Sequence, residues 1–179
     1  MPEHDAGSTT QLHLLVLRCQ AGDDSAFARL FESFADRSLR YLRGLVGDAA
    51  DDVQQEVWLS VYRNIASLAN PSAFCTWLFS TTRHRALDYL RRQKRERELL
   101  EDVAGEMRES IDETGLDARI DAALDSALSQ LSATHREVVL LRYRDDMGYG
   151  EIALVLGVPI GTVRTRLHYA KRRLQELLT

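Results

Sequence analysis

Apolar residues recur at intervals of three and four positions along most of this 179-residue chain. That spacing places them on one side of an α-helix, whereas a half-buried strand alternates apolar and polar residues. The chain shows no such alternating run, and only ten glycines and three prolines interrupt its pattern. We therefore predict an all-α fold.

The helical pattern fails near the middle of the chain. Residues 98–115 combine many acidic side chains and two glycines with few apolar positions, which is typical of a linker. We predict a disordered lead-in over residues 1–11, a first small helical domain over 12–97, a flexible acidic linker over 98–115, and a second small helical domain over 116–179.

Cysteine content and hydropathy bear on location. Cys19 and Cys75 are the only cysteines, and no apolar run reaches the roughly 18 residues that a membrane span needs. The N-terminus also lacks the basic and then apolar pattern of a signal peptide. These features predict a cytoplasmic protein that is not itself in the membrane.

Charge is unevenly distributed, although the formal net charge is −4. Residues 83–97 hold seven Lys or Arg and two acids, and residues 164–173 hold five Lys or Arg and no acid. Residues 96–125 hold eleven acids. Because phosphate binding depends on Lys and Arg, the two basic stretches are candidate nucleic-acid surfaces.

Residues 51–65 predict a helix with one unusual exposed side chain. Leu59 lies among polar residues, on the side opposite the apolar stripe. It can mark a partner surface, or it can be an isolated leucine on an ordinary solvated face, which this helix alone favours. The expected core side chains are Val53, Val57, Trp58, Val61, Tyr62 and Ile65.

The next predicted helix, residues 74–92, combines an aromatic with basic residues. Trp77 projects away from the apolar stripe onto a face with Thr81, His84, Asp88 and Arg91. An indole beside arginines suits the stacking of unpaired bases, but the same indole can pack against a neighbouring helix. The expected buried stripe is Cys75, Leu78, Phe79, Ala86, Tyr89 and Leu90.

A helix-turn-helix is the strongest local motif. Residues 152–156 supply a short apolar helix, Gly157 allows a tight turn, and Pro159 can begin a second helix. In the second helix, Arg164 and Thr165 are placed to enter a major groove, and residues 171–173 suit phosphate contacts. The expected core stripe is Val163, Leu167, Ala170, Leu174 and Leu177.

Together, residues 51–65, residues 73–95 and residues 131–174 resemble the extracytoplasmic-function group of bacterial RNA polymerase sigma factors. The resemblance extends from about Gly22 to Leu178. It implies a transcription initiation factor that binds the polymerase core, recognises the minus-ten and minus-thirty-five promoter elements and helps to melt the DNA, without being an enzyme. It also implies that the acidic linker threads the RNA exit path of the polymerase.

The resemblance further assigns roles to individual residues. The residues that it implies contact the clamp helices of the largest polymerase subunit are Asp52, Gln55, Glu56 and Leu59. Those implied at the minus-ten element are Asn70, Phe74, Trp77, Thr81, His84, Arg85, Arg91 and Arg92. Those implied at the minus-thirty-five element are Arg142, Tyr149, Arg164, Thr165, His168, Tyr169, Lys171 and Arg172.

Some positions depart from the group's pattern. Gly148 stands where Ser or Thr is more common, and Gly150 stands where an acid is more common. The first change removes a hydroxyl cap at a cost of a few tenths of a kcal/mol. The base preference at His84 does not carry over, because the group often has another residue there.

The expected partners are the polymerase core, including its clamp helices and flap region, promoter DNA, and an anti-sigma factor. We expect no cofactor, no metal and no small-molecule substrate, because Cys19, Cys75 and the five histidines show no ligand spacing. An alternative function is a stand-alone helix-turn-helix regulator that never enters polymerase. A further hypothesis follows from the segregation of charge. The two domains can fold together and mask Trp77 and Arg164, either against each other or beneath a dedicated inhibitor.

Overall fold

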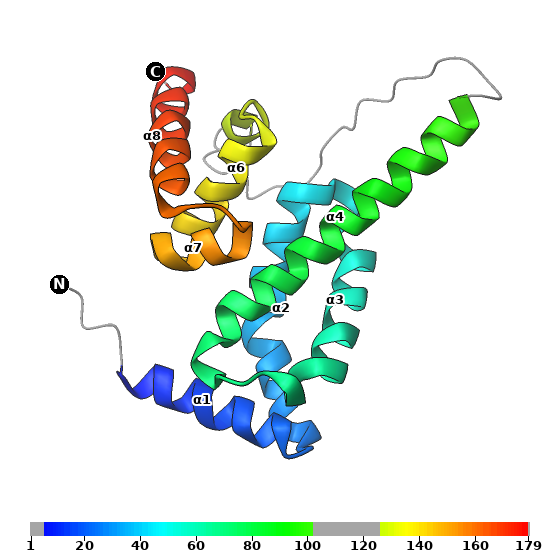
Figure 1. Ribbon diagram of the computed structural model, residues 1–179, viewed down its shortest axis with the longest axis vertical. Coiled ribbons are helices and arrows are strands. Elements are labelled where there is room, and N and C mark those ends of the chain that lie inside the picture. Colours follow the sequence, from blue (N-terminus) through cyan, green and yellow to red (C-terminus); the bar gives the residue numbers. More distant parts are fainter. Residues whose placement is uncertain (1–5, 102–125, 179) are drawn as a thin grey trace.

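The computed structural model describes residues 6–101 and 126–178, and every regular element within those ranges is helical (Figure 1). The all-α prediction is therefore confirmed. In the N-terminal unit the α-helices are α1 (Ala6–Gln20), α2 (Asp24–Val46), α3 (Ala50–Asn64) and α4 (Phe74–Glu101). Three short 3-10 turns join them: η1 (Gly47–Ala49), η2 (Ile65–Ser67) and η3 (Pro71–Ala73). In the C-terminal unit the elements are α6 (Ala133–Val139), the π-helical turn η4 (Leu140–Arg144), α7 (Tyr149–Leu156) and α8 (Ile160–Leu177).

Helices α1 to α4 enclose the core of the N-terminal unit. Asp23 caps the start of helix α2, since its carboxylate accepts a hydrogen bond from the Ala26 backbone nitrogen at 3.1 Å, and Gly47 follows the last residue of the helix with φ at 59°. A positive φ favours glycine at that position. Facing side chains of α2, α3 and α4 are fully or almost fully buried: Ala26, Leu30, Leu42, Val53, Val57, Val61, Leu78 and Ala86.

Two predicted domain boundaries differ from the structure. Helix α1 begins at Ala6, inside the expected lead-in, because Val16 and Cys19 anchor it in the core and the helix propagates towards the N-terminus. Helix α4 continues to Glu101, so the expected linker begins as helix. The rest of that linker, from residue 102 on, lies outside the described residues.

The C-terminal unit contains the predicted helix-turn-helix. Helix α7 ends at Gly157, which adopts the left-handed conformation at φ 65°, and α8 begins directly after Pro159. At the start of α7, the Glu151 carboxylate accepts a hydrogen bond from the Gly148 backbone nitrogen at 2.8 Å. This bond supports the helix start although Gly148 supplies no hydroxyl cap.

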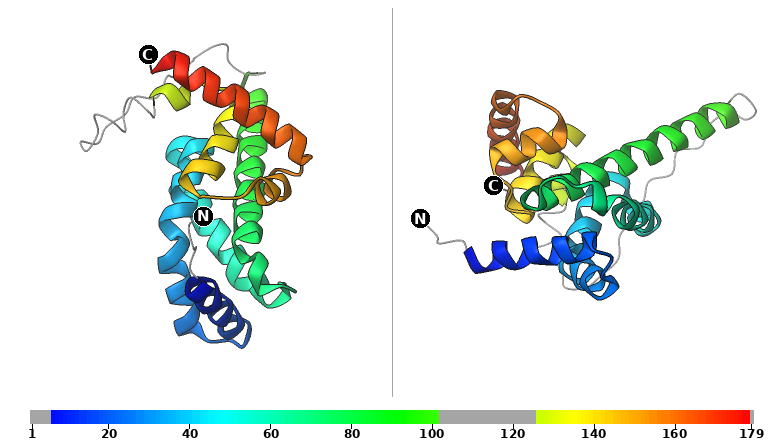
Figure 2. Two further views of the ribbon diagram at one scale, coloured as in Figure 1. Left: turned by 90° about the vertical axis from the view of Figure 1, so that its left-hand side faces the viewer. Right: turned by 60° about the horizontal axis from the view of Figure 1, so that its bottom comes forward.

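The two units pack directly on each other. Helix α7 lies against α4, and α6 and η4 lie against α2 (Figure 2). Tyr41 of α2 and Phe79 of α4 are buried in the same apolar cluster as the side chains of the C-terminal unit, with Cys75 packed against it. We call this contact between α2 and α4 on one side and α6, η4 and α7 on the other the seam.

Two buried acids of the C-terminal unit pair with the N-terminal unit across the seam. Glu137 accepts hydrogen bonds from the Tyr41 hydroxyl at 2.9 Å and from Arg83 Nε at 2.7 Å. Asp145 lies 3.3 Å from Arg37 Nε, and its backbone carbonyl accepts a 2.8 Å hydrogen bond from the same guanidinium. Burial and the nearby Glu137 carboxylate raise the pKa of Tyr41 well above its ordinary value.

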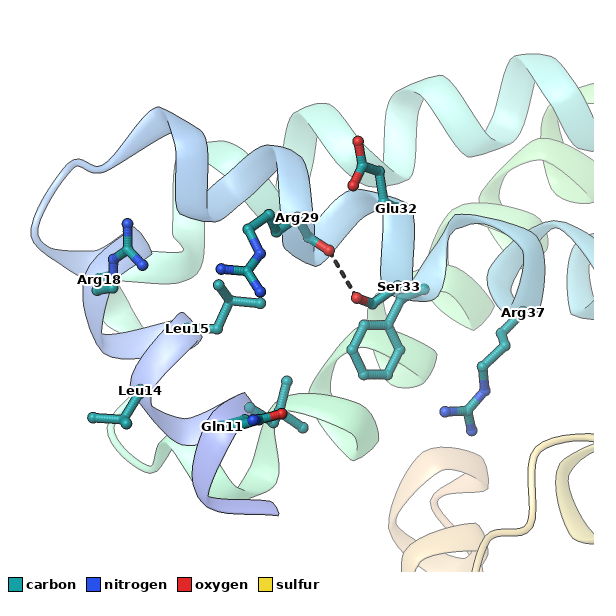
Figure 3. A pocket seen from close by; sticks show the side chains of 10 residues that line it. Gln11, Leu14, Leu15, Arg18, Arg29, Glu32, Ser33 and Arg37 are labelled. Carbon is teal, nitrogen blue, oxygen red and sulfur yellow. Dashed lines mark hydrogen bonds between the residues drawn. The ribbon is translucent and has the colours of Figure 1, made fainter. Parts of the chain in front are cut away.

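Arg37 also borders a groove of about 730 Å³ between α1 and α2. Leu14, Leu15, Arg18 and Arg29 line its other end, and Arg37 points away from them towards the C-terminal unit (Figure 3). Arg37 therefore borders both the groove and the seam. Among the described helices, none combines the length and apolar character that spanning a bilayer requires.

Candidate functional surfaces

The outer face of α3 presents an exposed leucine beside polar side chains. Leu59 is 55% exposed, Asp52 and Gln55 are exposed, and Glu56 is partly exposed. Glu56 lies 3.2 Å from Arg92 Nη2 of α4, so this face adjoins the basic part of α4. The predicted placement of Leu59 on the solvent side of the helix is confirmed.

The expected core stripe of α3 is correct except at Tyr62. Tyr62 is 54% exposed, and its hydroxyl donates a 3.1 Å hydrogen bond to Asp24, which raises the pKa of the phenol. Its ring packs edge-on against Phe27 of α2 at a centroid distance of 5.0 Å. Tyr62 therefore belongs to the surface rather than to the core.

One exposed aromatic side chain, Phe31, extends this surface onto α2, and the sequence pattern alone does not identify it. Phe31 is 42% exposed and packs against the ring of the buried Trp58 at 5.0 Å. Phe27 and Phe31 lie four positions apart, a spacing that places both on one helix face. That pair, next to the predicted α3 helix, is the signal that could have indicated Phe31.

The start of α4 corrects one predicted DNA contact. Phe74 is fully buried and packs against Phe34 at 5.3 Å between ring centroids. Its side chain therefore supports the core and is not available to DNA. Trp77 is half-buried, lies 6.2 Å from the Phe74 ring and packs against the N-terminal core. One side of the indole of Trp77 thus packs against the protein, as packing against a neighbouring helix requires, and the other side is open to solvent, as the stacking of an unpaired base would require.

The remaining minus-ten candidates differ in their contacts within the protein: some side chains form hydrogen bonds to neighbouring residues, and others are exposed. Asn70 caps the turn before α4, since its side-chain oxygen accepts a 3.0 Å hydrogen bond from the Ser72 nitrogen. Thr81 donates to the Trp77 carbonyl at 2.9 Å, and Arg85 reaches the Ser60 hydroxyl of α3 at 3.2 Å. His84, Arg91 and Arg92 are exposed along the outer side of α4.

Helix α8 presents its predicted DNA face to solvent. Arg164, Thr165, His168 and Tyr169 are exposed, while Val163, Leu167 and Ala170 are buried against α6 and α7. The Thr165 hydroxyl donates to the Gly161 carbonyl at 3.0 Å and keeps its lone pairs for an incoming donor. The helix therefore carries a polar and basic strip on a rigid base.

The two candidates outside α8 lie together at the start of α7. The Arg142 guanidinium lies over the Tyr149 ring at 5.8 Å and donates to the Met147 carbonyl at 3.0 Å. Tyr149 is 42% exposed. This cation–π pair holds the Arg142 guanidinium against Tyr149 at the start of α7.

Titratable groups near these surfaces have structural roles. Hydrogen bonds from Arg173 and Arg172 lower the pKa of Glu176 near the end of α8, so that carboxylate stays ionised and holds both guanidinium groups. Burial raises the pKa of the Cys75 thiol, which favours its unreactive form. Within the described ranges no three His, Cys, Asp or Glu side chains gather as a metal site would require.

Comparison with protein families matches both units. Residues 30–96 match the model described as Sigma-70 region 2, and residues 121–174 match the model described as Sigma-70, region 4. The ECF RNA polymerase sigma factor SigL of Mycobacterium tuberculosis is 35% identical to this chain over 165 residues, covering 87% of this chain and 90% of the relative. The chain belongs to the ECF sigma factors.

Further relatives agree with this assignment. The RNA polymerase sigma-H factor of Pseudomonas aeruginosa is 31% identical, with 92% of each chain covered. Among solved structures, the sigma factor RpoE of Bartonella quintana, in complex with the anti-sigma factor NepR, is 26% identical with a TM-score of 0.69, covering 85% of this chain and 96% of that one. CnrH, solved with the cytosolic domain of CnrY, shares the fold at a TM-score of 0.68 and 24% identity.

The family match divides this sigma factor at its seam. Region 2 covers most of α2, all of α3 and most of α4, and region 4 covers α6 to most of α8. Sigma factors are not a family of catalytic enzymes. The α3 and α4 surfaces therefore belong to region 2, and the helix-turn-helix belongs to region 4.

Proposed function

We propose that this sigma factor binds core polymerase through α3, melts the minus-ten element with α4, and recognises the minus-thirty-five element with α8. The observation that supports this division most strongly is the exposure of Leu59 on a helix whose opposite face is buried. An apolar side chain among acids fits a partner surface that buries the leucine and pairs with the carboxylates.

The test is transcription in vitro with purified core polymerase, since a sigma factor gives promoter-specific initiation only with core present. Leu59→Asp removes the apolar contact and should weaken core binding about ten-fold to a hundred-fold, as expected for a buried leucine. Leu14→Asp in α1 is the matched control, because Leu14 is 57% exposed and Leu59 is 55% exposed. Equal core binding by the two variants would contradict the assignment of α3.

Trp77 is proposed to stack on a base at the upstream edge of the melted minus-ten element. Its exposed half is available to a base, while its other half is fixed against the core beside Phe74. Stacking on an aromatic contributes about 1 to 3 kcal/mol per base, so Trp77→Ala should slow promoter opening and leave core binding intact. Potassium permanganate footprinting measures the opening.

Helix α8 is proposed to enter the major groove, with Arg164 and Thr165 at base edges and Lys171 and Arg172 on phosphates. Arg142, Tyr149, His168 and Tyr169 would flank the same strip. Exposed arginine and threonine near the start of a recognition helix suit contacts to base edges, which are specific, whereas basic residues further along suit phosphates, which are not.

We further propose an anti-sigma factor as a partner and the cytoplasm as the location. The solved relative from Bartonella quintana was crystallised with an anti-sigma factor, and its match to this chain covers 85% of the residues. Co-purification of the tagged protein from the cells that produce it, followed by mass spectrometry of the bound proteins, tests the partner.

A further inference from the structure

Helix α1 has one buried face and one apolar face that is turned to solvent. On the buried face, Val16 and Cys19 lie in the core of the N-terminal unit. On the other face, Leu14 is 57% exposed and Leu17 is 50% exposed. The two leucines are three positions apart, so they form one apolar strip along the helix. The fold does not use this strip, because the buried face already anchors α1.

The strip borders the groove of about 730 Å³ between α1 and α2. Leu15 points from α1 towards α2, and Leu14 lies at the outer edge of the groove (Figure 3). Leu12 and Phe34 complete the apolar part of the lining. An apolar groove beside an exposed apolar strip is suited to an amphipathic helix, whose side chains at positions i, i+3, i+4 and i+7 enter the groove.

The charge of the groove is mainly positive. Three arginines line it, Arg18, Arg29 and Arg37, whereas Glu32 is the acid among its lining residues and points away from α1 (Figure 3). Arg18 and Arg37 are each paired with an aspartate. Among the described residues, none forms a hydrogen bond or an ion pair with the Arg29 guanidinium, which reaches from α2 towards α1 (Figure 3). The groove therefore offers an unpaired guanidinium to an acidic partner.

A protein helix fits these features better than a small molecule or a nucleic acid does. A pocket for a small ligand encloses most of the ligand surface. This groove instead opens onto the exposed Leu14, and the strip continues to Leu17, beyond the lining residues. Single-stranded nucleic acid needs exposed rings on which its bases stack, but the ring in this groove, Phe34, is only 7% exposed.

Helix α1 also lies outside the parts of the chain that match the family models. The region 2 match begins at residue 30, after α1 and the first turn of α2, and the region 4 match begins at residue 121. The polymerase and promoter contacts common to the family are therefore expected on other helices. A binding surface on α1 would serve a partner that is specific to this sigma factor.

We propose that the α1 surface binds an acidic amphipathic helix of a partner protein. The α1 surface consists of Leu14, Leu15, Leu17, Arg18 and Arg29. Apolar side chains of the bound helix cover Leu14 and Leu17 and pack on Leu15, and a carboxylate of that helix pairs with Arg29. The proposal does not depend on the proposed function, because the α1 surface shares no residue with the surfaces assigned to polymerase or to DNA.

The probe is a displayed library of helical peptides of about 18 residues, or five turns, with randomised positions on one face. The library is first depleted on the double variant Leu14→Asp/Arg29→Glu and then selected on the full-length protein, so that only peptides that need the α1 surface remain. The selected peptides should carry large apolar residues at helical spacing, with Asp or Glu beside them. An absence of binders after depletion, or binders without acids, would overturn the proposal.

Fluorescence anisotropy then measures the affinity of the tightest peptide for single variants. Leu14→Asp should weaken binding about ten-fold to a hundred-fold, as expected for a buried leucine. Arg29→Glu should weaken it about three-fold to ten-fold, less at high salt, and a peptide with lysines in place of its acids should bind this variant better than the wild type. The matched controls are Leu59→Asp, at 55% exposure, and Arg43→Glu, an exposed arginine of α2 outside the groove lining. Both should bind the peptide as the wild type does, and circular dichroism verifies that each variant keeps its helices.

Other occupants of the α1 surface would give different results. A dimer of the full-length protein in analytical ultracentrifugation that Leu14→Asp dissociates would mean that a second copy of the chain covers the surface. Binding of random-sequence single-stranded DNA that Arg29→Glu abolishes would assign the groove to nucleic acid. Either result would overturn the proposal.

Core binding separates this proposal from the proposed function. Leu14→Asp should lose the peptide and keep core polymerase, whereas Leu59→Asp should lose core polymerase and keep the peptide. Loss of the peptide by Leu59→Asp as well would overturn the α1 surface, because the peptide would then contact α3. A Leu59→Asp variant that still binds core polymerase would instead contradict the proposed function and leave the α1 surface supported by the peptide.

Discussion

Helices α4 and α8 both carry arginines on a predicted DNA face, yet they are packed differently. Among the described elements, helix α8 packs mainly against α6 and α7, whereas α4 lies between α2 and α3 on one side and α7 on the other. Consequently the α8 candidates are exposed, but Phe74 at the start of α4 is buried and Trp77 is half-buried. A helical projection identifies a binding face reliably only where the helix has a single buried side.

The comparison of α4 with α8 predicts its largest effect, a loss of stability, at Phe74. Phe74→Ala removes a fully buried ring that packs against Phe34 and should lower the free energy of unfolding by about 3 to 5 kcal/mol. Urea unfolding followed by circular dichroism measures the loss. Phe31→Ala is the control, because its ring is 42% exposed and should cost much less.

A different outcome would restore the original assignment of Phe74. A variant as stable as the wild type, but slow in promoter opening, would mean that the ring leaves the core and contacts DNA. Comparable losses for Phe74→Ala and Phe31→Ala would remove the distinction between the buried and exposed sides of the N-terminal unit.

Arg164 tests the DNA face of α8, which is the exposed one of the two helices compared. Arg164→Ala should lose about 1 to 3 kcal/mol of discrimination between the correct and an altered minus-thirty-five element, if the guanidinium makes two hydrogen bonds to one base. Competitive binding of the holoenzyme to the two promoters measures this discrimination. Equal losses on both promoters would instead assign Arg164 to a phosphate.

The same contrast explains what the sequence could predict. The first part of the α8 core stripe and the exposure of Leu59 follow from local periodicity, and the structure has both. Leu174 and Leu177, near the end of that stripe, are only partly buried. Tyr62 was misassigned because it lies at the margin of its stripe, where its hydroxyl can reach solvent and Asp24. Periodicity places a side chain on a face, but it does not say how far a neighbouring helix covers that face.

The seam was beyond sequence reasoning for a different reason. Tyr41 and Glu137 are 96 residues apart, and Arg37 and Asp145 are 108 residues apart. No local sequence pattern links the two members of such a pair. Taken alone, Tyr41 looks like an ordinary buried tyrosine, and the three charged residues look like ordinary exposed charges. The hypothesis that the domains fold together came from charge segregation, which named neither of these contacts.

Asp145 offers a smaller effect that depends on pH. Burial, opposed by the charges of Arg37, Arg40 and Arg144, raises the pKa of this carboxyl from 3.8 to about 6. Because the native form binds the proton more tightly than the unfolded chain, this contribution to stability is complete below pH 3.8 and is lost as pH rises through 6. Between pH 7.5 and pH 5 the wild type should gain about 1 kcal/mol relative to Asp145→Asn.

The measurement is urea unfolding of the wild type and Asp145→Asn across that pH range. Other carboxyl groups titrate equally in both proteins, so the difference between them isolates Asp145. A constant difference from pH 7.5 to pH 5 would mean that the carboxyl has an ordinary pKa, as it would if the seam were open in solution.

Replacing Lys171 should have the smallest effect on DNA binding, and it tests the phosphate-contacting part of the exposed face of α8. It is exposed on the outer side of α8, beyond the positions expected at base edges, and so suits a phosphate. Lys171→Ala should weaken holoenzyme binding to all promoters alike and reduce the slope of log affinity against log salt by about 0.9, the value for one lost phosphate contact. Filter binding at several salt concentrations measures the slope.

Because Arg164 is assigned to a base and Lys171 to a phosphate, the two variants should show different effects. Arg164→Ala should change sequence preference, and Lys171→Ala should change salt dependence. A change of sequence preference in Lys171→Ala would mean that base contacts extend further along α8 than its exposed strip suggests.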